Sequence, residues 1–187
     1  MNIMKKIKIL SIIFLVLIFT TLKAENVQLL LNKDYVWVLS KYIRNAKKEI
    51  IISSFLWCCR PNQSSSFPCK ILDEIVDAVK RGVNVTIIFE KDYRGENDCN
   101  NLTMYVFKYK LGKKYSNFSI YFDSPIVRSH EKIVLIDGEY CFIGSHNLTQ
   151  SALKYNNEVS VLIKSKEIYY KLKKYLMNIK NHGEKIF

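Results

Sequence analysis

Hydrophobic residues recur along the chain at two intervals, and these intervals predict the order of its helices and strands. Residues 34–48 carry apolar side chains at helical spacing and end in lysines, which predicts a helix. The apolar run EIIISSFLW at 49–57 predicts a buried strand. After a polar loop, KILDEIVDAVKRG at 70–82 predicts an amphipathic helix that ends at Gly82, and VNVTIIFE at 83–90 predicts a second strand.

The second half of the chain continues this alternation. Strand, helix and strand in succession form a βαβ unit, so the strands at 49–57 and 83–90 are expected to be parallel neighbours. A rougher helix at about 101–111 leads into a strand, FSIYF, at 118–122. A hairpin, the strand EVSVLI and the basic helix KEIYYKLKKYLMNIK complete the pattern. The sequence therefore predicts an α/β fold with a mixed, largely parallel β-sheet flanked by helices on both faces.

Length and composition agree with such a fold. The chain has 187 residues, of which 49% are hydrophobic and 25% charged. It contains no internal repeat or low-complexity tract, and a chain of this length fits one domain with its own core. We expect residues 25–187 to form that single domain.

The first 24 residues have the layout of a secretory signal peptide. Lysines precede an apolar run at 9–19, and the small residue Ala24 follows. The run is too short to cross a bilayer comfortably as a helix. Because Leu22 and Lys23 make a poor cleavage site before Ala24, an uncleaved membrane anchor is the alternative. In either case the sequence predicts an exported domain, periplasmic or secreted.

Export bears on the cysteines, which are Cys58, Cys59, Cys69, Cys99 and Cys141. In an oxidising compartment, clustered cysteines in loops usually pair. We predict one or two disulfides that join Cys58 or Cys59 to Cys69 and Cys99, because adjacent cysteines seldom bond to each other. A four-cysteine zinc site is the alternative, although the spacing lacks C-x-x-C pairs. Cys141 lies in an apolar strand and is expected to remain a buried thiol.

Polar residues on the predicted hairpin raise the question of chemistry. In HEKIVLID, His130 and Lys132 are two positions apart and therefore point to the same side of a strand. Two such groups on an apolar strand need a polar partner, and a phosphate would provide one. Asp137 is followed by Gly138, a strong hairpin-turn dipeptide, so a structural role for Asp137 is favoured over direct chemistry.

The hairpin and the residues after it resemble a known signature. The pattern consists of His130, Lys132, Asp137, Gly144, Ser145, Asn147 and Glu158. It resembles the HKD motif of the phospholipase D superfamily, and AVKRGVNVTIIFE is similar to the first half of that family. The resemblance covers most of the chain after the leader. With a single motif, the chain is most similar to the small Nuc-type endonucleases and their single-motif phospholipase relatives. His146, between Ser145 and Asn147, has no role in the motif and is interpreted as incidental.

The resemblance implies a phosphodiesterase that uses no metal or other cofactor and forms a phosphohistidine intermediate. His130 of one subunit would attack phosphorus, and the partner's His130 would protonate the leaving oxygen. One motif supplies one histidine, so the resemblance implies a homodimer with the site at its two-fold axis. Lys132 and Asn147 would hold the phosphate oxygens, and Ser145 would add a donor. Glu158 would accept an imidazole N–H and fix the ring.

Three functions remain open from the sequence. The formal charge of +12 is still +8 without residues 1–24, which favours a polyanionic partner. A nuclease of low sequence specificity is favoured because basic and aromatic residues alternate at 105–115, a pattern that suits single-stranded nucleic acid. A phospholipase D acting on anionic membrane lipid is the alternative. A non-catalytic binding module is the third, and it would not need His130.

Overall fold

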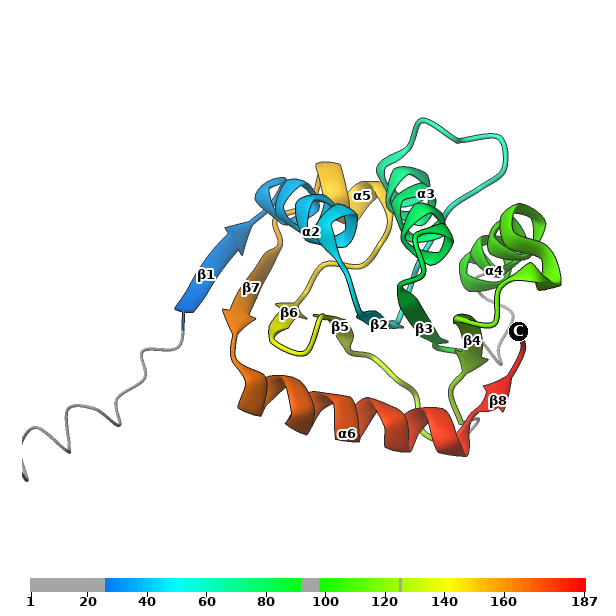
Figure 1. Cartoon of the computed structure of the whole chain (residues 1–187). Helices are drawn as coiled ribbons and strands as arrows, with labels where there is room; N and C mark the ends of the chain where they lie inside the picture. Colours follow the sequence, from blue (N-terminus) through cyan, green and yellow to red (C-terminus); the bar gives the residue numbers. More distant parts are fainter. Residues whose placement is uncertain (1–25, 92–97, 125) are drawn as a thin grey trace, which may run out of the picture.

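The centre of the fold is a mixed β-sheet whose strand order is β1-β7-β6-β5-β2-β3-β4-β8 (Figure 1). The computed structural model describes residues 26–91, 98–124 and 126–187, so the predicted signal peptide lies outside the described residues. The strands are β1 (Asn26–Leu31), β2 (Glu49–Ser54), β3 (Asn84–Phe89), β4 (Phe118–Phe122), β5 (Lys132–Ile136), β6 (Tyr140–Gly144), β7 (Val159–Lys164) and β8 (Glu184–Lys185).

The predicted mixed sheet is confirmed, but parallel pairing is confined to its centre. Strand β2 is parallel to β3 and β3 to β4, as the βαβ pattern predicts. The remaining pairings among the described strands are antiparallel, including β2 with β5 and β5 with β6. The sheet is thus less parallel than expected, because the second half of the chain returns by a hairpin and by edge strands instead of by crossover helices.

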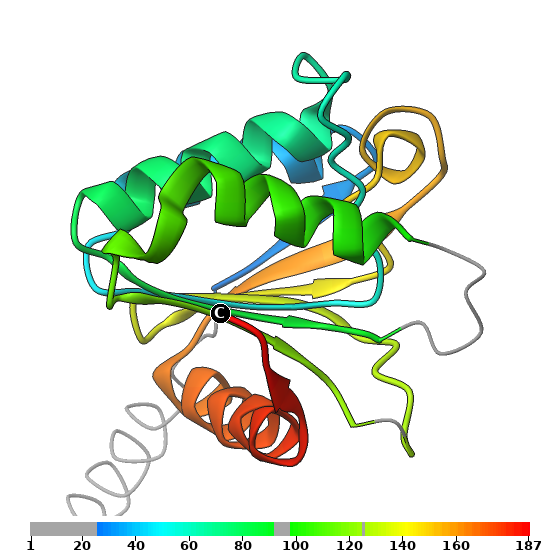
Figure 2. The ribbon, with the colours of Figure 1, turned by 90° about the vertical axis from the view of Figure 1, so that its right-hand side faces the viewer.

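Helices cover both faces of the sheet, as predicted (Figure 2). One face carries α2 (Asp34–Asn45), α3 (Phe67–Lys80), α4 (Cys99–Leu111) and the short α5 (Gln150–Lys154), and the other carries α6 (Lys166–His182). The 3₁₀ turn η1 (Gly112–Lys114) follows α4. Among the described residues, no helix is both long enough and apolar enough to cross a bilayer.

The central strands are buried on both faces, which leaves no room for polar chemistry inside them. Ile50 and Ile52 of β2 pack into the core beneath α2 and α3, whereas Ile51 packs into the core beneath α6. Strand β5 divides in the same way, with Leu135 on the α6 side. Strands buried on both faces read as continuous apolar runs, which explains the sequence EIIIS. Polar groups of these strands must therefore lie at the ends.

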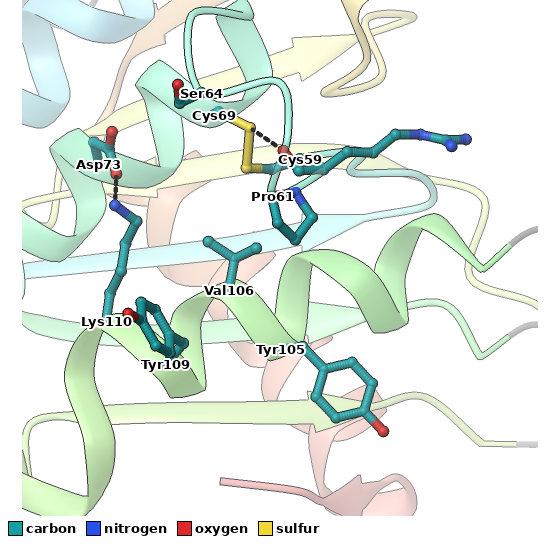
Figure 3. A pocket seen from close by; sticks show the side chains of 10 residues that line it. Cys59, Pro61, Ser64, Cys69, Asp73, Tyr105, Val106, Tyr109 and Lys110 are labelled. Carbon is teal, nitrogen blue, oxygen red and sulfur yellow. Dashed lines mark hydrogen bonds and ion pairs between the residues drawn. A yellow bond between two sulfur atoms is a disulfide. The ribbon is translucent and has the colours of Figure 1, made fainter.

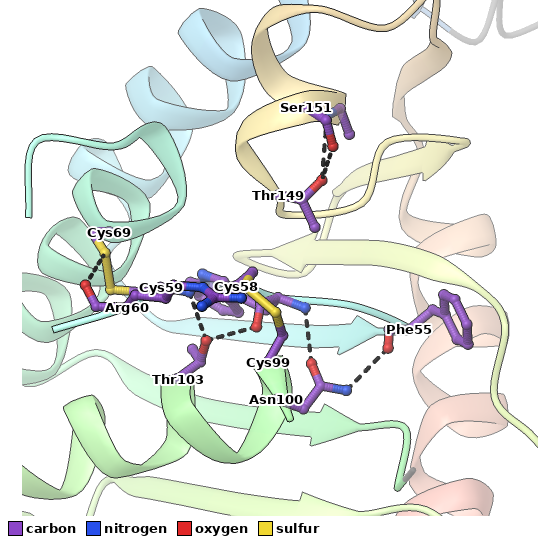
Figure 4. Close-up of a disulfide and its surroundings, with 12 residues drawn as sticks. Phe55, Cys58, Cys59, Arg60, Cys69, Cys99, Asn100, Thr103, Thr149 and Ser151 are labelled. Atoms are coloured by element: carbon purple, nitrogen blue, oxygen red, sulfur yellow. Dashed lines mark hydrogen bonds between the residues drawn. A yellow bond between two sulfur atoms is a disulfide. The ribbon is translucent and has the colours of Figure 1, made fainter. Parts of the chain in front are cut away.

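Two disulfides brace the segment that follows β2 (Figure 4). Cys58 is bonded to Cys99 at the start of α4, and Cys59 is bonded to Cys69 in the first turn of α3. Cys141 is a buried free thiol. The predicted disulfides are confirmed, and since they use all four loop cysteines the zinc alternative is wrong.

The two disulfides should stabilise the fold unequally, because the chain entropy that a cross-link removes grows with the length of its loop. The bonded residues are 41 apart for Cys58–Cys99 and 10 apart for Cys59–Cys69. Replacing the first pair by serine should lower the free energy of unfolding by about 4 kcal/mol, and replacing the second pair by about 3 kcal/mol. Urea unfolding followed by circular dichroism measures both losses. A larger loss from the shorter loop would contradict this ordering.

Candidate active site

Most of the predicted site residues meet at the edge of the sheet where the parallel strands end. His130 lies just before β5, and Lys132 is its first residue, paired with Ser54 at the end of β2. Ser145 and Asn147 follow β6, and Glu158 directly precedes β7. In open α/β sheets, ligands bind beyond the carboxyl ends of the parallel strands. Five of the six predicted site residues therefore share the edge at which this fold places a ligand.

His130 and Lys132 are in direct contact, as their spacing predicts. The Lys132 Nζ lies 3.4 Å from the His130 Nδ1, and it donates a hydrogen bond to the His130 carbonyl at 2.5 Å. The imidazole is exposed and Lys132 is half-buried. A nucleophilic ring and a cation thus stand side by side, open to an incoming anion.

The aromatic ring of Phe55 contacts both His130 and Lys132. The Phe55 ring centroid lies 4.2 Å from that of His130 and 4.7 Å from the Lys132 Nζ. The guanidinium of Arg128 lies 5.5 Å from the same ring. Cations are attracted to the face of an aromatic ring at these distances. Phe55 therefore gathers two cations and the imidazole around one surface.

Buried acids hold the loop that leads into His130. Asp123 is buried and accepts hydrogen bonds from the backbone N–H groups of Lys91 (2.9 Å) and Ser129 (2.8 Å). Glu90, also buried, accepts from the Arg128 Nε at 2.8 Å. Because β3 and β4 end at these two acids, the strands themselves fix the position of the loop.

The residues after β6 form a second polar cluster. The Ser145 hydroxyl donates to the Glu158 carboxylate, which also accepts from the Asn156 amide at 3.0 Å. Among the described residues, no hydrogen bond joins Glu158 to His130, so the contact that the resemblance implies stays a prediction. The Asn147 Oδ1 is buried and has no donor within the described chain, a costly state unless binding supplies a partner.

Gly144 permits this cluster to form against β7. A Cβ at this position would lie 2.1 Å from the Ser160 Oγ and 2.4 Å from the Ser160 Cα. Any larger residue would push β6 away from β7, so the glycine of the motif has a steric reason.

The structure places Asp137 at the opposite end of β5 from His130. Its carboxylate accepts hydrogen bonds from the backbone N–H groups of Lys47 (2.8 Å), Lys48 (2.8 Å) and Glu49 (3.1 Å). Asp137 also has a positive φ of 56° in the hairpin turn. The HKD resemblance places Asp137 among the catalytic residues, and the structure corrects this: Asp137 ties the turn to the start of β2, the structural role that its turn dipeptide favoured.

His146 is a packing residue rather than a part of the site. Its imidazole is buried, lies 2.7 Å from the Ser160 Oγ and 2.9 Å from the Asn32 carbonyl, and stacks on Tyr35. This agrees with its interpretation as incidental to the motif. No cluster of three His, Cys, Asp or Glu side chains suited to a metal occurs in the part of the chain that the structure describes.

Electrostatics keep the site poised for an anion. Desolvation, followed by the charges of Lys132 and Arg128, lowers the pKa of His130 below its ordinary value, and Glu131 opposes the shift. Desolvation also lowers the pKa of Lys132, against the charges of Glu131 and Glu158. The imidazole of the single chain is therefore neutral near pH 7, the form in which a ring nitrogen can attack.

Sequence reasoning missed four side chains that shape the site: Phe55, Glu90, Asp123 and Arg128. The only available signal was positional. Glu90 and Asp123 directly follow apolar strands, where polar residues at the carboxyl edge of a parallel sheet gather around ligands. Phe55 looked like part of the buried strand at 49–57, but β2 ends at Ser54.

Comparison with known proteins establishes the family. The family model described as "Cardiolipin synthase, PLD-like domain" matches residues 39–180, which is most of the chain. The chain therefore belongs to the phospholipase D superfamily, as its HKD motif predicts.

Individual relatives are more distant. The chain is 24% identical over 160 residues to the DISARM protein DrmC of Bacillus paralicheniformis. This match covers 80% of this chain and 58% of that protein. It is 26% identical over 121 residues to the virion nicking-joining enzyme of Vaccinia virus. This match covers 65% of this chain and 27% of that protein. The chain thus spans only part of the length of these relatives.

A solved structure of similar size shares the whole fold. Nuc from Salmonella typhimurium, a phospholipase D family member, superposes with a TM-score of 0.70 at 22% identity. The match covers 87% of this chain and 98% of Nuc. The fold is thus that of a known phospholipase D family member.

The pKa of His130 should respond to the cation beside it. In Lys132→Met, loss of the charge 3.4 Å from Nδ1 should raise the pKa of His130 toward its ordinary value of 6.5. Because the folded-state pKa lies below the unfolded value of about 6.5, the stability linked to this group is present above that pH and is lost as pH falls from there through the folded-state pKa. NMR titration of the imidazole protons measures the shift. Lys171→Met, on an exposed lysine of α6, is the control. An unchanged pKa in Lys132→Met would contradict the electrostatic coupling.

Proposed function

We propose that this protein is a metal-independent phosphodiesterase that forms a phosphohistidine intermediate and cleaves nucleic acid with little sequence preference. The observation that carries the proposal is the exposed His130 imidazole in contact with the Lys132 ammonium at the ligand-binding edge of the sheet. A neutral imidazole is a competent nucleophile, and the adjacent cation offsets charge on the attacked phosphate.

Each residue of the cluster has a role in this reaction. His130 attacks phosphorus, while Lys132 and the Asn147 amide bind the non-bridging oxygens as negative charge develops. Ser145 and Glu158, which are hydrogen-bonded to each other, border the same edge. Ser145 adds a hydroxyl donor, and Glu158 orients the imidazole in the assembled site.

The reaction requires a second histidine that is protonated while His130 is neutral, so that it can act as the general acid. The leaving oxygen needs a proton from a group that is charged when His130 is neutral. His146 is buried against Ser160. His182, at the end of α6, lines a pocket with Arg128 and Glu131, but among the described residues no hydrogen bond joins it to His130. We propose that the partner's His130 supplies the proton, in a homodimer whose two-fold axis passes through the site.

Nucleic acid is the substrate class that the chain supports best. The net charge of +12 favours a polyanion, and one relative is a virion nicking-joining enzyme. The match to Nuc over nearly its whole length supports a small domain that carries one half-site. A phosphodiester backbone also presents many equivalent cleavage points to a site with no built-in base readout.

Membrane phospholipid is the alternative substrate, and one observation favours it. Ile126 and Val127, close before His130, are 88% and 70% exposed. They line a pocket of about 360 Å³ together with Arg128, Glu131 and Tyr175. Exposed apolar side chains beside a phosphate site suit a lipid surface or a second subunit.

We also propose that the domain works outside the cytoplasm. The two disulfides are characteristic of proteins in oxidising compartments. The predicted signal peptide at 1–24 agrees with this proposal.

The substrate assay separates the three functions. Protein is incubated in chelator with plasmid, single-stranded DNA, RNA, and vesicles of phosphatidylcholine or cardiolipin. We expect turnover of nucleic acid that His130→Ala lowers by at least about a thousandfold. Lys171→Ala, at an exposed lysine of α6, is the control. Turnover of lipid alone would reverse the substrate assignment. Full activity of His130→Ala would remove the site from the reaction.

The shared site predicts that activity depends on protein concentration. At concentrations below the dissociation constant of the dimer, specific activity should fall in proportion to the dimer fraction, because a lone chain carries one motif histidine. Sedimentation velocity and activity are measured over the same dilution series. A fully active monomer would rule out a site shared across the two-fold axis.

A further inference from the structure

A second concave surface lies between the disulfide-braced loop and α4 (Figure 3). This pocket has a volume of about 410 Å³. Its lining includes Cys59, Arg60 and Pro61 on the loop side and Tyr105, Val106 and Tyr109 on α4. We call it the α4 groove. None of the HKD residues lines it, so it is separate from the candidate active site.

Two exposed tyrosines dominate the helical side of the α4 groove. Tyr105 is 62% exposed and Tyr109 is 90% exposed, although both are large aromatic residues. They are four positions apart, which places them on one face of the helix. Phe107, between them in sequence, is fully buried in the core. The aromatic residues of this helix therefore have two roles: Phe107 packs in the core, whereas Tyr105 and Tyr109 face solvent.

The opposite wall of the α4 groove is rigid. Cys59 is bonded to Cys69, and its backbone N–H donates to the Thr103 hydroxyl at 2.9 Å. Thr103 in turn donates to the Trp57 carbonyl at 2.6 Å. Figure 4 shows these bonds linking the loop to α3 and α4. A wall held in this way loses little conformational freedom when a ligand binds.

The charge at the rim of the α4 groove favours an anion. The Arg60 side chain is exposed and has no ion-pair partner among the residues that the structure describes. Lys110 is paired with Asp73 at 3.0 Å, so that pair adds no net charge. Lys113 and Lys114 follow at the end of α4 and are exposed. The net charge along this side is therefore positive.

We propose that the α4 groove binds single-stranded nucleic acid, with bases stacked on Tyr105 and Tyr109 and backbone phosphates near Arg60. The proposal rests on the proposed function, which it extends from nucleic acid in general to single strands. Stacking on exposed rings beside basic groups is how proteins hold single strands without reading their sequence. Bases in a duplex are already stacked and cannot use these rings.

The α4 groove lies within reach of the active site. Phe55, which contacts His130, and Cys59 in the groove lining are four positions apart, so their Cα atoms lie at most about 14 Å apart. We therefore expect a long single strand to extend from His130 into the α4 groove, and a dinucleotide to bind at His130 alone.

The test measures binding and cleavage by a variant of both tyrosines. In a His130→Ala background, which leaves the ligand intact, anisotropy follows binding of labelled dT20, dT2 and a 20-base-pair duplex. Tyr105→Ala/Tyr109→Ala should weaken binding of dT20 about a hundredfold, about tenfold for each lost stack. Binding of dT2 and duplex should change less than about threefold on the same grounds. Tyr170→Ala, on an exposed tyrosine of α6, is the control.

Cleavage distinguishes failure of this inference from failure of the proposed function. Cleavage is measured in protein that retains His130. There, the ratio of kcat/KM for dT20 to kcat/KM for bis(p-nitrophenyl) phosphate should fall in Tyr105→Ala/Tyr109→Ala and should not fall in Tyr170→Ala. If the unaltered protein cleaves nucleic acid but the double variant binds dT20 as the control does, the inference alone is wrong. If the unaltered protein cleaves only lipid, the proposed function is wrong. Tyrosine-dependent binding to phosphatidylglycerol vesicles without binding to dT20 would make the α4 groove a membrane contact and overturn the inference.

Discussion

The pairing register of β2 with β5 is the constraint on which the site depends. Ser54 pairs with Lys132, and the same register pairs Ile52 with Val134 and Ile50 with Ile136 in the core. Side chains alternate across a strand, so a shift of one residue would exchange the side chains of β5 between the two cores and turn Lys132 to the other face of the sheet. Burial of the strand interiors thus determines which side chains reach the edge. The positions of His130 and Lys132 therefore follow from hydrophobic packing several residues away.

Positively charged side chains gather at that edge, and buried hydrogen-bonded acids hold the loop that carries them. His130, Lys132 and Arg128 surround the Phe55 ring, while the buried acids Glu90 and Asp123 hold the loop in place. Like charges held close together raise the energy of the empty site, and a phosphate would relieve that repulsion. Desolvation, and after it the charges of Lys132 and Arg128, lower the pKa of His130. The site is organised for an anion before one arrives.

The segment between β2 and α3 connects the two surfaces discussed above. It begins at Phe55 beneath His130 and continues to Cys59 in the α4 groove. Asn100 holds its start, since the amide donates to the Phe55 carbonyl at 3.0 Å and accepts from the Trp57 N–H at 2.8 Å. Two disulfides hold its end. This braced segment therefore links the candidate active site to the α4 groove through covalent and hydrogen bonds.

Local patterns in the sequence predicted much of this molecule. Hydrophobic periodicity predicted most helices and strands to within a few residues but missed β1, α5 and β8. The HKD spacing predicted the contact of His130 with Lys132. The clustered cysteines predicted disulfides but did not determine which cysteines pair. Such signals are readable because they depend on residues that are neighbours in the chain. The tertiary structure alone decided the rest. Asp137 binds backbone groups about 90 positions earlier, and Phe55 lies beneath a histidine 75 positions later. Those contacts arise from strand order and register, which periodicity does not encode.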